Sequence, residues 1–175
     1  MLLSLLLMAC LPKASVVSAP SPMSVAVVAA LEPLEDATVR PMPAEIDRRV
    51  NQLLLARNLR PVAIAEADWE SAFTKGRTTR FRVAHAAMAS ETDLVLVVEA
   101  FARYGSQLNG RYRWTVQVSA SLAPGGKPED AVTSEFNVPV FLQFSHEQEA
   151  EAVAAAATVI ERQLGHLLDQ VLGGL

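Results

Sequence analysis

Cysteine is almost absent from this chain, because Cys10 is the only one among 175 residues. A single thiol excludes an internal disulfide, so the folded part must depend on its core for stability. Aromatic residues are also scarce at 6%, whereas hydrophobic residues as a whole make up 51%. The composition therefore predicts a globular chain with an aliphatic core rather than a disordered one.

An excess of positive charge is missing too, since 15 basic residues face 19 acidic ones and the formal net charge is −4. This balance argues against general binding to nucleic acid, which depends on neutralising phosphates. The sequence has no G-x-x-x-x-G-K-[ST], G-x-G-x-x-G or G-x-S-x-G motif, and these motifs mark common phosphate-binding and nucleophile turns. We expect no nucleic-acid partner and no nucleotide cofactor.

The three histidines, His85, His146 and His166, give little sign of catalysis or metal binding. His85 lies among apolar residues of a predicted helix, which is typical of a structural histidine. The glutamates around His146 are explained as acids in the first turns of a helix, where they favour the positive end of the dipole. The sequence predicts a protein without a catalytic residue, a metal or another cofactor.

No long hydrophobic run is present, and the apolar stretch that ends at Ala9 is far shorter than the ~20 residues that span a bilayer. It has the length of a signal-peptide core. The stretch Leu7-Met8-Ala9-Cys10 resembles a bacterial lipobox, which implies that Cys10 becomes the first mature residue and carries lipid. The segment LPKASVVSAPSP that follows Cys10 is typical of an extended tether.

These features predict a signal peptide over residues 1–9, a lipidated tether over 10–22 and a single α/β domain over 23–175. The expected location is the cell envelope, as an outer-membrane lipoprotein that faces the periplasm and contacts the bilayer through acylated Cys10. Cleavage after Val17-Ser18-Ala19 would instead give a secreted or periplasmic soluble protein. A cytoplasmic protein with an apolar tail is the third alternative.

Hydrophobic periodicity divides the remaining chain into strands and helices. Strands are expected over 23–30, 60–67, 93–101, 112–122 and 135–144, and helices over 43–58 and 78–90, with a short turn over 69–73 and a loop over 31–43. Pro139 removes a ladder donor and predicts that its strand lies at a sheet edge. The alternation in the strand over 112–122 predicts one buried face and one wet face that includes Gln117, Ser119 and Ser121.

The last helix is the clearest element. Ser145 followed by Gln148 fits a capping box, and an apolar stripe then runs towards Gly173. Its members are Val153, Ala157, Ile160, Leu164, Leu167, Leu168 and Val171. We expect this stripe to pack on the strand over 112–122, because neither apolar face can be buried alone.

The sequence thus predicts an α/β (α+β) fold, with a mixed sheet of about five strands and two main helices, the last of them C-terminal. The run SVAVVAA, the Thr92-Asp93-Leu94-Val95-Leu96 entry and the terminal helix give a layout that resembles the amino-terminal domain of TolB and the curli-secretion lipoproteins. This resemblance spans about residues 24–172. It implies an accessory or assembly role in the envelope.

One dense run of cations lies at the start of the helix over 78–90 and comprises Lys75, Arg77, Arg80 and Arg82. These four residues are a candidate patch for an anion or for an acidic partner. A solvated loop and first helical turn would produce the same pattern. We therefore expect a non-enzymatic lipoprotein that binds another envelope protein, or alternatively a transport-accessory module that recognises a lipid, glycan or peptide.

Overall fold

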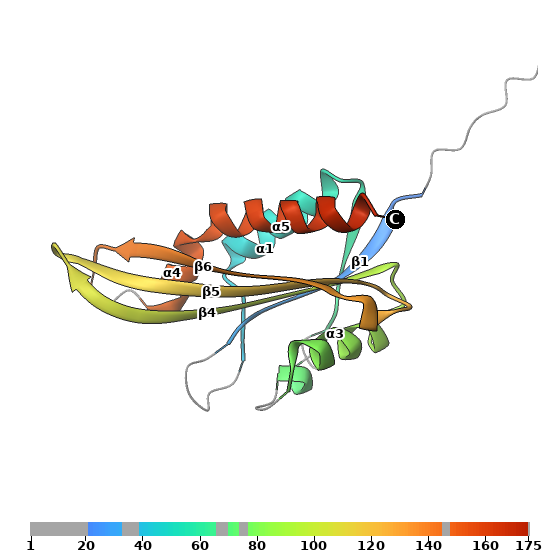
Figure 1. Ribbon diagram of the computed structural model, residues 1–175, viewed down its shortest axis with the longest axis horizontal. Helices are drawn as coiled ribbons and strands as arrows, with labels where there is room; N and C mark the ends of the chain where they lie inside the picture. Colours follow the sequence, from blue (N-terminus) through green and yellow to red (C-terminus); the bar gives the residue numbers. More distant parts are fainter. Residues whose placement is uncertain (1–20, 33–38, 66–69, 74–76, 145–147, 175) are drawn as a thin grey trace, which may run out of the picture.

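The uninterrupted apolar runs of the sequence form the centre of a mixed six-stranded sheet (Figure 1). The computed structural model describes residues 21–32, 39–65, 70–73, 77–144 and 148–174. Strand β1, Met23–Leu31, pairs in parallel with β3, Leu59–Ala63, and with β4, Leu94–Leu108. Residues 94–100 of β4 are buried on both faces of the sheet, as their unbroken hydrophobicity predicts.

The second half of the sheet is antiparallel. Strand β4 pairs with β5, Arg111–Pro124, which pairs with the edge strand β6, Val132–Leu142. The strand order is β2-β1-β4-β5-β6, with β3 beside β1. The edge position predicted from Pro139 is confirmed, because β6 needs a donor on one side only.

The hairpin between β4 and β5 is longer than the sequence suggested. The sequence predicts a strand that ends at Phe101, but β4 continues to Leu108. Only Asn109 and Gly110 form the connection, with φ of 51° and 76°. Asparagine and glycine tolerate these left-handed values, and such two-residue turns match the twist of a hairpin.

Three helices cover one face of the sheet and enclose the larger core. They are α1, Ala44–Leu55, α4, Glu149–Ala155, and α5, Ala157–Leu172. An ion pair joins α1 to α5, with Arg49 Nη1 at 2.6 Å from Glu161 Oε2. Arg57, which follows α1, places its Nε at 2.9 Å from Asp169 Oδ1 of α5. The predicted stripe of the terminal helix packs in this core together with Val116, Val118, Ala120 and Leu122 of β5.

The start of the terminal helix differs from the prediction. Gln148 is the N-cap itself rather than the third residue of the helix, and Ser145 lies outside the described residues. The capping box is formed by Gln148 and Glu151, whose Oε2 accepts the Gln148 N–H at 2.9 Å. The helix is also divided at Ala156, where the N–H bonds to the carbonyls of both Ala152 and Val153 and tightens the turn.

Helix α3, Thr79–Met88, and the 3₁₀ turn η1, Glu70–Phe73, lie on the other face of the sheet and enclose a smaller core. Thr78 caps α3 by accepting the Phe81 N–H. The expectation that Ser121 faces solvent is wrong, because it is fully buried in this layer. Its hydroxyl is satisfied by Thr133 Oγ1 at 2.8 Å.

The segment expected as a loop over 31–43 contains a two-residue strand, β2, Arg40–Pro41, which pairs with the end of β1. Between β5 and β6, the 3₁₀ turn η2, Pro128–Asp130, follows Gly125. A Cβ on Gly125 would lie 1.9 Å from the Thr92 carbonyl oxygen, so only glycine fits this close approach. In the described ranges, no helix is long and apolar enough to span a membrane.

Candidate functional site

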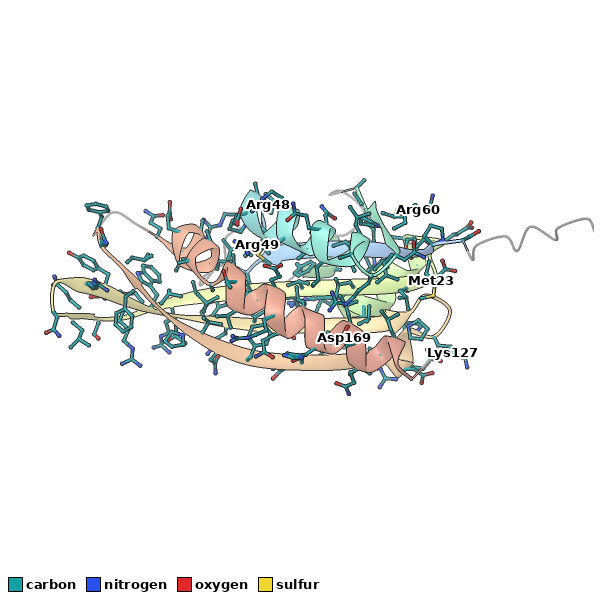
Figure 2. The ribbon with its side chains drawn as sticks, turned by 90° about the horizontal axis from the view of Figure 1, so that it is seen from above. Met23, Arg48, Arg49, Arg60, Lys127 and Asp169 are labelled. Carbon is teal, nitrogen blue, oxygen red and sulfur yellow. The ribbon has the colours of Figure 1, made fainter. Side chains whose placement is uncertain are left out.

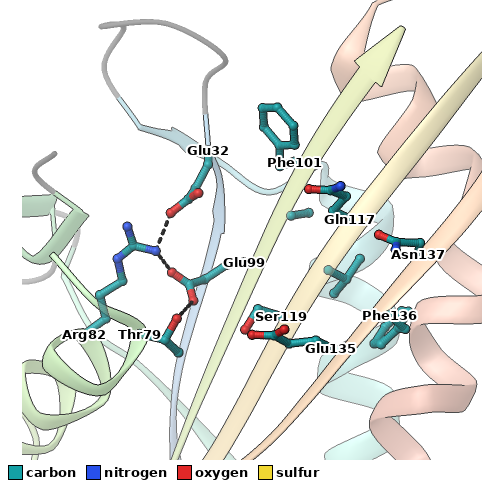
Figure 3. Close-up of a pocket in the computed structure, with 12 residues that line it drawn as sticks. Glu32, Thr79, Arg82, Glu99, Phe101, Gln117, Ser119, Glu135, Phe136 and Asn137 are labelled. Atoms are coloured by element: carbon teal, nitrogen blue, oxygen red, sulfur yellow. Dashed lines mark hydrogen bonds and ion pairs between the residues drawn. The ribbon is translucent and has the colours of Figure 1, made fainter. Parts of the chain in front are cut away.

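Helix α3 covers only part of its face of the sheet, and the uncovered part contains a polar cavity (Figure 3). The cavity has a volume of about 480 Å³ and opens to solvent. Its walls come from the end of β1, the start of α3 and the outward face of β4, β5 and β6. The lining residues are Glu32, Thr79, Arg82, Glu99, Ala100, Phe101, Gln117, Val118, Ser119, Glu135, Phe136 and Asn137.

A buried charge cluster forms one wall of the cavity. Arg82 reaches from α3 and pairs through Nη1 with the carboxylates of Glu32 and Glu99 (Figure 3). Glu99 is only 5% exposed and also accepts a hydrogen bond from Thr79 Oγ1 at 3.1 Å. Two carboxylates thus share one guanidinium, and removing that cation would leave a buried negative charge without compensation.

The strand register shows which residues of the sheet face the cavity. Glu99, Ser119 and Glu135 are paired across β4, β5 and β6 and therefore share the outward face. In the next row on the same face, Phe101, Gln117 and Asn137 are paired in the same way. The first row gives the cavity two carboxylates and a hydroxyl group, and the second row gives it an aromatic ring and two side-chain amides.

Three of the four cations predicted as a patch are in the described part of the chain, and they have different surroundings. Arg82 is turned into the cavity and paired, whereas Arg77 lies over the Phe81 ring with Cζ 4.3 Å from its centroid. Arg80 is exposed on α3, and Lys75 lies outside the described residues. Among the three that the structure describes, only Arg82 lines the cavity.

The sequence pattern does not single out the three glutamates of the cavity as a group, although Glu99 carries a signal of its own. It is the one charged residue in the apolar run from Leu94 to Phe101. A carboxylate in a strand that is buried on both faces requires a partner cation from another element. Neither Glu32 nor Glu135 stands out in this way, because each lies among polar or turn-forming neighbours.

The described histidines lie outside the cavity lining. His85 stacks on Phe81, with ring centroids 6.0 Å apart, and His166 is on the exposed side of α5. His146 lies outside the described residues. Within the ranges that the structure describes, no group of three or more histidine, cysteine, aspartate or glutamate residues could hold a metal ion.

A second candidate surface is the far end of the β4–β5 hairpin, which projects beyond the helices (Figure 1). We call it the β-arm, residues 103–113 together with Phe141 and Phe144. Every residue from Arg103 to Arg111 is exposed, with Tyr104 at 45% and Leu108 at 51%. Tyr104 packs edge-on against Trp114 at a centroid distance of 5.6 Å, and this contact stiffens the base of the arm.

No protein-family model and no curated protein matches this chain. Solved structures do resemble it. The hypothetical protein CT253 from Chlamydia trachomatis superposes with a TM-score of 0.50 at 9% identity, over 86% of this chain and 96% of that one. Lipoprotein GNA1162 from Neisseria meningitidis gives 0.44 at 15% identity, over 83% and 99%. A PelC dodecamer subunit from Paraburkholderia phytofirmans gives 0.43 at 16% identity, over 84% and 88%.

The shared property is the fold. The likeness to CT253 supports the mixed α/β architecture described above, and identities this low say nothing about a common activity. The resemblance to the TolB amino-terminal domain, drawn from the order of elements, stays a prediction. Function therefore has to be argued from the sites of this chain.

Proposed function

We propose that the protein is a non-enzymatic lipoprotein of the cell envelope that binds another envelope protein through the β-arm. Two observations support this proposal: the lipobox-like stretch that ends at Cys10, and the position of the arm relative to the tether. The position of the arm is the observation on which the proposed function mainly rests. Met23, where the tether enters the fold, lies at the end of the molecule opposite to the hairpin (Figure 2).

The sheet register explains this polarity. Because β1 and β4 are parallel, with Val25 paired to Leu94, both strands start at the same end of the sheet. Strand β4 has 15 residues, which at ~3.3 Å per residue carry the chain about 50 Å from that end. An acyl group on Cys10 would hold the starting end near the bilayer, and the arm would then point away from it.

The side chains of the arm favour a protein surface as its partner. It exposes Tyr104, Leu108, Phe141 and Phe144 at one end of the sheet, and large exposed apolar side chains are typical of interaction sites. Arg103, Arg111 and Arg113 are exposed among them, while no acidic residue occurs between Glu99 and Glu129. We expect a partner surface that is acidic and partly apolar.

Site-specific crosslinking in the native envelope tests this function. A photo-crosslinking amino acid in place of Leu108 should give one adduct of defined mass, because this side chain is exposed on the arm. The matched control replaces Leu55, which is 61% exposed on α1, and should give none. Equal adducts at both positions, or none at Leu108, would contradict the proposal.

A ligand-binding module is the second candidate function, and the polar cavity is the observation that favours it. The cavity lies between the start of α3 and the outward face of the sheet, and polar side chains from both line it.

A further inference from the structure

The polar cavity has an excess of negative charge. Among the residues that the structure describes, three carboxylates, those of Glu32, Glu99 and Glu135, line it together with one cation, Arg82. Their formal charges sum to −2 when all four groups are ionised. A ligand that enters this space is therefore favoured electrostatically if it is positively charged.

The cation that lines the cavity, Arg82, is already paired with carboxylates of the protein. Arg82 pairs with both Glu32 and Glu99, and its side chain is only 12% exposed. Glu135, by contrast, makes no ion pair in the described part of the chain. Its carboxylate points towards Ser119, its register partner on β5 (Figure 3).

Ser119 supplies an independent observation. Its Oγ has almost no accessible surface and no hydrogen-bond partner among the residues that the structure describes. A buried hydroxyl without a partner is costly and uncommon in folded proteins. Because a hydroxyl oxygen accepts hydrogen bonds, an ammonium or guanidinium placed between Ser119 and Glu135 would satisfy both groups.

The remaining walls suit an organic cation. Phe101 provides aromatic surface on the same face of the sheet, and Gln117 and Asn137 provide amide oxygens. Rings beside a cation add a favourable interaction with its charge. The volume of about 480 Å³ far exceeds the ~30 Å³ that one water molecule occupies in the liquid.

We propose that this cavity binds the alkylammonium or guanidinium group of a ligand, with the cation between Glu135 and Ser119 and its carbon chain along Phe101. The group could belong to a free amine or to a lysine or arginine side chain of a peptide. The inference is independent of the β-arm and of lipidation at Cys10.

Calorimetric titration of the purified chain tests the site with two pairs of probes. Cadaverine is compared with pentanediol, its uncharged analogue, and an amide-capped lysine is compared with its side-chain-acetylated form. We expect binding of the charged member of at least one pair and no binding of either neutral member. The pair that binds more tightly identifies the source of the group as a free amine or a peptide side chain.

Glu135→Gln should weaken that binding by about five- to tenfold, because it removes one charge-assisted hydrogen bond. Glu135 is exposed and unpaired, so the fold should be unaffected, and an unchanged melting temperature verifies this. Glu129→Gln, an exposed acid outside the cavity lining, is the matched control and should bind like the parent chain. Absence of binding by both charged probes, equal binding of a neutral analogue, or undiminished binding by Glu135→Gln would overturn the proposal.

Discussion

At the scale of single residues, Asp93 joins the two central parallel strands. Its Oδ2 accepts the Ser24 N–H at 2.7 Å and the Ser24 hydroxyl at 2.8 Å, while its own N–H donates to Ser24 Oγ at 3.1 Å. The Ser24 N–H and then its hydroxyl hold the pKa of the Asp93 carboxyl below its ordinary value. The ionised form therefore stabilises the folded state.

This shift predicts a specific dependence of stability on pH. Because the folded pKa is depressed, the unfolded chain binds more protons at acidic pH, and the stabilisation is fully present only above the unfolded pKa of about 3.9. It is lost as the pH falls through the folded pKa. Asp93→Asn should therefore lower the melting temperature at neutral pH, and its difference from the parent chain should shrink below about pH 4.

Thermal melts of both chains from acidic to neutral pH measure this difference. Asp130→Asn, which removes an exposed carboxylate on η2, is the control and should leave the melting temperature nearly unchanged throughout. A constant gap between Asp93→Asn and the parent chain at all pH values would show that the Asp93 charge is not responsible.

Arg82 shows how far single residues can be interpreted from sequence. The run of cations was visible, but the partners of Arg82 are in β1 and β4, and only the folded sheet brings them to α3. The sequence therefore predicted a candidate anion site at a cation that Glu32 and Glu99 already neutralise. Charge patterns along the chain do not reveal compensation by distant residues.

At the scale of elements, packing of α5 on the sheet confirms the prediction made from the two periodicities. The residues at helical spacing in α4 and α5 and those at alternate positions in β5 meet in one core. Gly165 lies where α5 approaches α1, and a Cβ there would be 3.2 Å from Arg57 Nη2. Such contacts make α5 an integral layer of the fold rather than a free amphipathic helix.

Leu164→Ala should destabilise the protein strongly, because Leu164 is 1% exposed at the centre of this layer. Truncating a buried leucine typically costs about 2–5 kcal/mol in the free energy of unfolding. Gln117→Ala, on the exposed opposite face of β5, should change it by less than about 0.5 kcal/mol. Urea denaturation of the two variants measures both effects, and similar stabilities would refute the assigned packing.

Hydrophobic periodicity did not predict where β4 ends or which positions of β5 are covered. The alternation in β5 continues through Ser121, and nothing in that strand alone shows that α3 covers this position. The extension of β4 to Leu108 likewise depends on pairing with β5, because Gly105, Ser106 and Gln107 have low intrinsic strand preference. Local pattern located the strands, and long-range pairing set their ends and their covered faces.

At the scale of the whole molecule, the fold has two distinct ends. One end carries Met23, the first residue of β1, and the other carries the β-arm (Figure 2). The polar cavity lies on the open face of the sheet between them. This arrangement would let an anchored molecule contact a partner through the arm while the cavity stays open to solvent.

The predicted anchoring rests on the lipobox-like stretch that ends at Cys10, and Cys10 lies outside the described residues. If Cys10 carries lipid, each buried CH₂ group contributes roughly 0.8 kcal/mol, and several acyl chains together hold the protein on the membrane. Cys10→Ala should therefore move the chain from the membrane fraction to the soluble fraction. Leu164 and the rest of the core are untouched, so its melting temperature should match that of the parent domain.

Mass spectrometry of the amino-terminal peptide from the parent chain provides the direct measurement. A lipid mass on a peptide that begins at Cys10 would establish the modification, whereas an unmodified peptide that begins at Pro20 would indicate cleavage after Val17-Ser18-Ala19. The second result would remove the reason for the arm to point away from a bilayer. Partner binding would then have to be explained without anchoring, and crosslinking at Leu108 would still show whether the arm is the surface that binds.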